Sequence, residues 1–164
     1  DYIVDRERKE TSAGEMTRGE TDRWTLFDRL ITRFKKECPG ITDRGSTPDS
    51  WLYLPIGHSA MHFEWTYRKR PHPHFFVSFH LEKDNYDENK SVLSALEKHK
   101  DEFKKALGED IVYDYHWSTN WCRLYVEHDF EEDEQKMDDW IIETTKKFYQ
   151  HIKPRIDQIV SKKK

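Results

Sequence analysis

The chain is poor in the motifs that mark most catalytic sites. Its six glycines are all isolated, so no glycine-rich loop is present to cradle a phosphate. Ser59 and Ser78 both lack the G-x-S-x-G setting of a hydrolase nucleophile. No run of about eighteen apolar residues occurs, which excludes a membrane-spanning segment and a membrane partner. These absences argue against a self-contained enzyme, and no cofactor is expected.

Cysteine is equally scarce. Only Cys38 and Cys122 occur, far apart and without C-x-x-C spacing. Two structural thiols in a reducing, cytoplasmic protein are the simplest interpretation. A disulfide between the two is the alternative, and it would need Cα atoms within about 7 Å. We expect the Cys122 side chain to point inward, where a thiol is inert.

The charge is nearly balanced. Charged residues make up 37% of the 164 residues, and the net charge is −4. This balance disfavours a protein held to nucleic acid by bulk positive charge, although a local basic patch remains compatible with it.

Aromatic residues are abundant, at 14% of the chain, so we expect one core built from a few large side chains. Residues 22–160 are expected to form a single domain, with 1–21 a linker or upstream tail and 161–164 a basic tail. Within the tail, residues 2–4 are compatible with one short strand.

Hydrophobic periodicity predicts the elements of this domain. The first is a helix capped by Thr21 or Asp22, with Trp24, Phe27, Leu30, Ile31 and Phe34 buried. Strands over 51–54, 61–67 and 75–82 follow, and then a helix over 86–107 that Gly108 closes. Strands over 111–117 and 122–128 precede a last helix, which begins in an acidic turn at 131–134 and is kinked at Pro154. Trp117 is expected to share the inward face with Cys122. About five mainly antiparallel strands with one apolar face predict an α+β two-layer sandwich, in the order α-β-β-β-α-β-β-α, with helices packed on one face only.

Several of these segments carry a resemblance. They are the strand before Asn85-x-x-x-Asn89-Lys90, the helix end from Lys100 to Gly108, the aromatic strand around Trp117, Arg123, and the tail from Phe148 to Pro154. Over roughly residues 23–160, the chain resembles the uncharacterised bacterial and archaeal domain-of-unknown-function family 4268. Such domains often follow a segment that looks like a PD-(D/E)XK nuclease. The resemblance implies an accessory domain of a nuclease-associated, restriction- or defence-type protein, and it supplies no catalytic residues.

A nuclease site within this chain is not expected. A metal-dependent nuclease needs carboxylates and a lysine clustered at strand ends. Glu88 and Lys90 have the E-x-K spacing, but they open a helix. Glu7 and Lys9 have it too, in a chain where charged triplets are common.

The sheet face away from the helices is expected to be polar. Arg123 and Tyr125 lie on it and could contact phosphate or stack on a base. The alternative is an ordinary solvated face, as any such sheet displays.

Four side chains on this face have the chemistry of a metal site. Pairing of the two strands would set His62 near His80, with Glu64 and Glu82 beside them. Zinc accepts imidazoles and carboxylates, but cross-strand pairs of this kind are common without an ion.

The turn between these strands carries the best local basic cluster. Arg68, Lys69 and Arg70 are followed by His74, and together they could contact phosphate. A solvated turn is the alternative. Residues 127–139 are acidic, so any nucleic-acid contact is expected at the opposite end of the molecule.

Three functions stay open. The first is a non-catalytic recognition domain that contacts nucleic acid or an upstream nuclease domain. The second is a protein-interaction or dimerisation module, in which exposed Phe76 and Tyr149 mediate association, for example as a homo-oligomer. The third is a metal-dependent hydrolase that uses the His/Glu sheet face.

Overall fold

The computed structural model describes residues 16–162. Its elements are α2 (Arg18–Glu37), β1 (Trp51–Pro55), β2 (Met61–Arg68), β3 (His74–Leu81), α3 (Tyr86–Glu97), α4 (Lys100–Leu107), β4 (Val112–Asp114), β5 (Cys122–Asp129), α5 (Glu134–Lys147), the π-helical turn η1 (Phe148–Ile152) and α6 (Lys153–Lys162). The expected short strand at residues 2–4 and the triplet at residues 7–9 lie outside the described residues.

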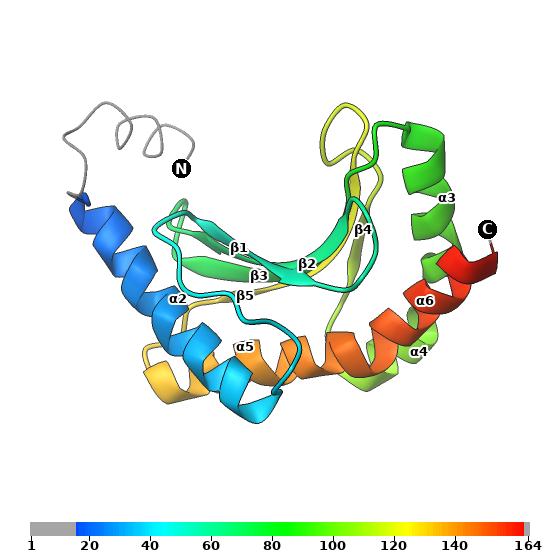
Figure 1. Cartoon of the computed structure of the whole chain (residues 1–164). Helices are drawn as coiled ribbons and strands as arrows, with labels where there is room; N and C mark the ends of the chain where they lie inside the picture. The colour runs from blue at the N-terminus through cyan, green and yellow to red at the C-terminus, as the bar shows by residue number, and fades with distance from the viewer. Residues whose placement is uncertain (1–15, 163–164) are drawn as a thin grey trace.

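The five strands form one antiparallel sheet in the order β1-β2-β3-β5-β4. The sheet is curved, and the helices lie along its convex side and at its two ends, while none of the helices of residues 16–162 lies on the concave side (Figure 1). This arrangement confirms the predicted α+β fold. We call the sheet surface that faces away from α5 the concave face.

The core lies between the sheet and the helices and is rich in aromatic rings. Trp65 and Phe63 are fully buried there. Phe34 of α2 meets the Trp65 ring edge-on at 5.8 Å, and Phe148 of η1 meets Phe63 at 5.3 Å. Large rings thus join α2 and η1 to the strand β2, as the aromatic composition predicted.

The first helix begins earlier than predicted. Thr17, not Thr21 or Asp22, is its N-cap, and it forms a capping box with Glu20. Trp24, which was expected in the core, is 39% exposed. Arg23 takes the buried position instead and donates from Nε to the carbonyl oxygen of Pro48 at 2.8 Å.

The predicted helix over 86–107 is broken into two. Asn85 caps α3, and Gly108, with φ of 67°, ends α4 as expected. Between them, α3 packs against β5 and α6, whereas α4 packs against α5 and η1. Tertiary packing therefore divides a segment that is helical by local propensity.

The last helix bends where η1 precedes Pro154 (Figure 1). A proline and a π-helical turn are both recognised causes of a bend, so the predicted kink is confirmed. None of the helices in residues 16–162 is long and apolar enough to cross a membrane.

The fourth strand is shorter than predicted. Tyr113 pairs with Leu124 and shares its face, as expected, but β4 ends at Asp114 and residues 115–121 form a loop. Trp117 was expected inward, and this prediction is wrong because strand alternation stops before it. Both cysteines are free, and Cys122 is fully buried as predicted.

We expect Thr145→Val to lower the free energy of unfolding by about 1–3 kcal/mol, because it would leave a buried donor without a partner. Trp65 donates from its indole nitrogen to Thr145 Oγ1 at 2.8 Å. Thr32→Val, at an exposed position of α2, is the control and should change stability by less than about 0.5 kcal/mol. Urea denaturation of both variants measures the difference, and equal losses would contradict this account of the core.

Candidate functional site

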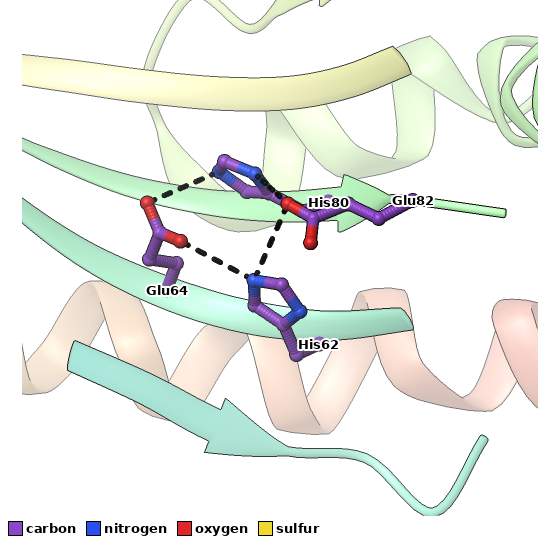
Figure 2. A group of neighbouring side chains, drawn as sticks. All are labelled: His62, Glu64, His80 and Glu82. Carbon is purple, nitrogen blue, oxygen red and sulfur yellow. Dashed lines mark hydrogen bonds and ion pairs between the residues drawn. The ribbon is translucent and has the colours of Figure 1, made fainter. Parts of the chain in front are cut away.

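Four polar side chains meet at the centre of the concave face. The register of β2 and β3 sets His62 opposite His80 and Glu64 opposite Ser78, which confirms the predicted hairpin. Glu82 follows directly after β3. Figure 2 shows that the two imidazoles and two carboxylates alternate around a closed ring of contacts.

The contacts in this ring are short. His62 Nε2 lies 3.2 Å from Glu64 Oε1 and 3.9 Å from Glu82 Oε2. His80 approaches Glu64 Oε2 through Nε2, at 3.4 Å, and Glu82 Oε2 through Nδ1, at 3.2 Å. The two imidazole rings are stacked with their centres 5.1 Å apart. We call these four residues the His/Glu cluster.

The cluster is largely shielded from water. His80 is 1% and Glu64 7% exposed, and Ser78 beside them is fully buried. The interpretation of the concave face as an ordinary solvated surface is therefore wrong at its centre. Buried charged and polar groups of this kind need partners, and here they partner one another.

Glu64 is held as a carboxylate. Burial alone would raise its pKa, but the hydrogen bond from His62, the nearby His80 imidazole and the hydrogen bond from Thr66 lower the pKa below its ordinary value. The Thr66 hydroxyl donates to Glu64 Oε2 at 2.6 Å.

The loop of residues 115–121 shields this centre. It is closed by a hydrogen bond from the Trp117 amide to the carbonyl of Trp121, at 3.1 Å. The fully buried Asn89 of α3 donates to the carbonyl of Asn120 at 2.7 Å. The Trp117 ring packs edge-on against His80 at 5.8 Å. We call this segment the tryptophan loop.

Arg123 contacts the tryptophan loop by stacking on the Trp117 ring. Its guanidinium carbon lies 3.7 Å from the centre of the Trp117 ring, 4.4 Å from that of Tyr125 and 5.5 Å from that of Phe76. Its Nε lies 3.4 Å from a carboxylate oxygen of Asp114. The side chain is 11% exposed, and burial lowers its pKa. The structure thus places Arg123 and Tyr125 in an aromatic stack at the edge of the site.

A hollow of about 200 Å³ opens above the His/Glu cluster. Aromatic side chains line it on both sides, and Glu64, His80 and Glu82 lie among its lining residues. The aromatic members are Trp51 and Tyr53 of β1 and Trp117 and Trp121 of the tryptophan loop. Aromatic residues from two separate elements and the carboxylates of Glu64 and Glu82 therefore line one hollow.

The basic turn (Arg68, Lys69 and Arg70) lies at one end of the same face. Lys69 and Arg70 are exposed, whereas Arg68 lines the hollow. His74, also expected to contact a ligand, is 8% exposed, and its Nδ1 lies 2.7 Å from the carbonyl oxygen of His72.

Any nucleic-acid contact was expected at the opposite end of the molecule from the acidic stretch of residues 127–139, but the basic turn does not lie there. The sheet register aligns Arg68 with His74 and His74 with Asp129. Asp129, which belongs to the acidic stretch, therefore lies beside the basic turn, and its carboxylate is 2.7 Å from His72 Nε2. A contact through the turn alone would meet this neighbouring negative charge.

Two other residues do not lie as expected. Phe76, predicted to be exposed, is 8% exposed because its ring packs against Tyr125 and His74. Tyr149 is half-buried, and its hydroxyl donates to the carbonyl of Pro55 at 2.8 Å. Burial raises its pKa. Neither ring offers the exposed apolar surface that the dimerisation hypothesis assumed.

Sequence reasoning found the His/Glu cluster but missed the walls of the hollow. Trp121 was assigned to a turn and Trp51 to a strand without a role. The spacing Trp117-Ser-Thr-Asn-Trp121, two tryptophans in one short connection, is the signal that could have marked the tryptophan loop.

Over residues 16–162, the fold and the site define a class of domain: an α+β sandwich with an aromatic-lined hollow on the sheet face opposite its helices. The family model described as "Domain of unknown function (DUF4268)" matches residues 21–156, and the chain belongs to that family. Comparisons with curated proteins and with solved structures give no match.

We expect Arg123→Lys to lower the free energy of unfolding by about 1–2 kcal/mol, because an ammonium keeps the charge but loses the planar stack on Trp117. Arg44→Lys is the matched control, since the Arg44 guanidinium lies 5.7 Å from the Tyr53 ring centre and its side chain is exposed. Urea denaturation gives the stabilities, and hydrogen exchange at the Trp117 amide reports loop opening. A lysine variant as stable as the wild type would contradict the role of Arg123.

Proposed function

We propose that this chain is a non-catalytic recognition domain that binds single-stranded nucleic acid in the hollow of the concave face. The observation that carries the proposal is the set of aromatic residues from β1 and from the tryptophan loop that line one hollow, on the face that the helices of residues 16–162 leave uncovered. Bases of any sequence stack on aromatic side chains, with about 1–3 kcal/mol per base.

The shape of the site favours a single strand over a duplex. Reading base edges in the major groove of a duplex requires a helix or a two-stranded ribbon that projects from the protein, and a hollow of about 200 Å³ is too small to admit a duplex. The concave face is recessed, with α2 at one end and α3 at the other (Figure 1). An unstacked base can enter such a hollow, whereas a double helix cannot.

The basic turn supplies charge for the backbone of the strand. Lys69 and Arg70 are exposed beside the hollow, and Arg68 lines it. Because phosphate contacts release counterions, binding that uses these residues weakens as salt increases. The adjacent Asp129 limits this contribution, so stacking in the hollow provides most of the affinity.

The role within a nuclease-associated protein is part of the same proposal. The support for this role is that the chain belongs to the family. The resemblance to this family implies that the domain is an accessory part that follows a nuclease-like segment. Glu88 and Lys90 lie in the first turn of α3 instead of at strand ends, where they cannot cooperate as a nuclease site does. Recognition of a strand by this domain would deliver it to a nuclease centre elsewhere.

Fluorescence anisotropy of labelled oligonucleotides tests the proposal. We expect single strands to bind with micromolar affinity, more tightly than the matching duplex, and to weaken as salt is raised. Trp121→Ala removes one wall and should weaken binding about 5- to 150-fold, the equivalent of about 1–3 kcal/mol. Replacing Arg68, Lys69 and Arg70 together by Ala should reduce both affinity and its dependence on salt.

Trp24→Ala is the matched control, because Trp24 is an exposed tryptophan on α2. It should leave binding unchanged. Absence of binding at tens of micromolar protein would refute the proposed function for this domain. Equal affinity of Trp121→Ala and the wild type would refute the hollow as the binding site.

A further inference from the structure

We propose that His62, Glu64, His80 and Glu82 bind one divalent transition-metal ion of the zinc type beneath the hollow. This inference goes beyond the proposed function and does not depend on it, since it concerns the floor of the site and not the aromatic walls.

The spacing of the donor atoms suits such an ion. One donor atom from each of the four side chains lies within 4.8 Å of the other three. His62 Nε2 lies 3.2 Å from Glu64 Oε1 and 3.9 Å from Glu82 Oε2, and His80 Nδ1 lies 3.2 Å from Glu82 Oε2. Tetrahedral zinc, with bonds of about 2.0–2.2 Å, keeps its ligand atoms about 3.4 Å apart. Small rotations of the side chains would therefore complete a coordination shell.

The chemistry of the donors also points to zinc. Two imidazole nitrogens and two carboxylate oxygens form a mixed set that zinc accepts, whereas magnesium and calcium prefer oxygen alone. Glu64 and Glu82 approach the imidazoles from opposite sides in Figure 2, so the four groups surround a common point. They do not line up along a surface, as solvated acidic groups do.

The ligands are held by further contacts. Ser78 Oγ lies 2.9 Å from His80 Nε2, and the Thr66 hydroxyl donates to Glu64. The Tyr53 ring lies against the His62 ring, with centres 4.2 Å apart. Such partners fix the orientation of metal ligands and are a regular part of metal sites. All three come from neighbouring strands of one sheet, which is a rigid support.

The carboxylates also suit a divalent ion. Glu64 and Glu82 bring two acidic groups together at a place where Glu64 is 7% exposed, and a divalent ion would offset two negative charges. The alternative is a cluster held together by imidazolium–carboxylate pairs alone, which would not bind the ion because imidazolium has no free lone pair.

Calorimetric titration of chelator-treated, untagged protein with zinc chloride separates these two states. We expect one zinc per chain, a dissociation constant in the micromolar range or below, and a higher melting temperature with zinc present. Cobalt(II) in place of zinc should give the strong visible absorption of a four-coordinate site. No saturable binding of either ion to the unmodified protein would overturn the proposal, whatever the variants do.

Variants of the two partly exposed residues of the His/Glu cluster test whether zinc binds there. The side chains of His62 and Glu82 are 13% and 18% exposed, so His62→Gln and Glu82→Gln keep the fold, as circular dichroism can check. Each should weaken zinc affinity about 10-fold or more. His58→Gln is the control, because His58 forms an imidazole–carboxylate pair with Asp157 at 2.7 Å outside the cluster. Unchanged affinity in both variants, or an equal loss in the control, would overturn the assignment.

The zinc titrations are made on the protein without nucleic acid. A failure of the proposed function would therefore leave the metal result standing, and a failure to bind zinc would leave the anisotropy result standing.

Discussion

The His/Glu cluster determines how the uncovered face of this domain is built. In the described residues, helices shield one side of the sheet, yet β2 and β3 bring two imidazoles and two carboxylates to the middle of the other side. Polar and charged groups at 1–7% exposure are costly unless they are paired and covered. The tryptophan loop provides the cover, and Arg123 and Asn89 hold the loop in place.

The tryptophan loop covers the His/Glu cluster only in part, and the part of the concave face left open is the proposed binding site. Between β1 and the tryptophan loop the hollow of about 200 Å³ remains open. Aromatic residues form the walls of the hollow, so a planar ring of a ligand can stack against them. Glu64 and Glu82 at its floor determine which charge on a ligand is favourable there. A recessed site of this kind depends on shape and stacking more than on net charge, in keeping with a chain whose net charge is −4.

The sequence allowed the sheet to be predicted better than the site. Alternation along 61–67 and 75–82 was regular, so the hairpin register and the meeting of His62 with His80 followed from it. The tryptophan loop did not follow, because alternation was extended to Trp117 across a strand that ends at Asp114. The position of Asp129 beside the basic turn depends on β5 pairing with β3, a long-range pairing that local patterns do not encode. Burial of Glu64 was missed for the same reason, since the covering loop is remote in sequence.

Nuclear magnetic resonance of the six tryptophan indole N–H groups tests the central claim, that the concave face is the binding surface. Trp51, Trp117 and Trp121 line the hollow, whereas Trp65 lies in the core, Trp24 on α2 and Trp140 on α5. Upon addition of a short single-stranded oligonucleotide, we predict that the signals of the first three move together and saturate, while the other three stay in place. Movement of Trp24 or Trp140 alone, or no movement at the hollow, would contradict the account.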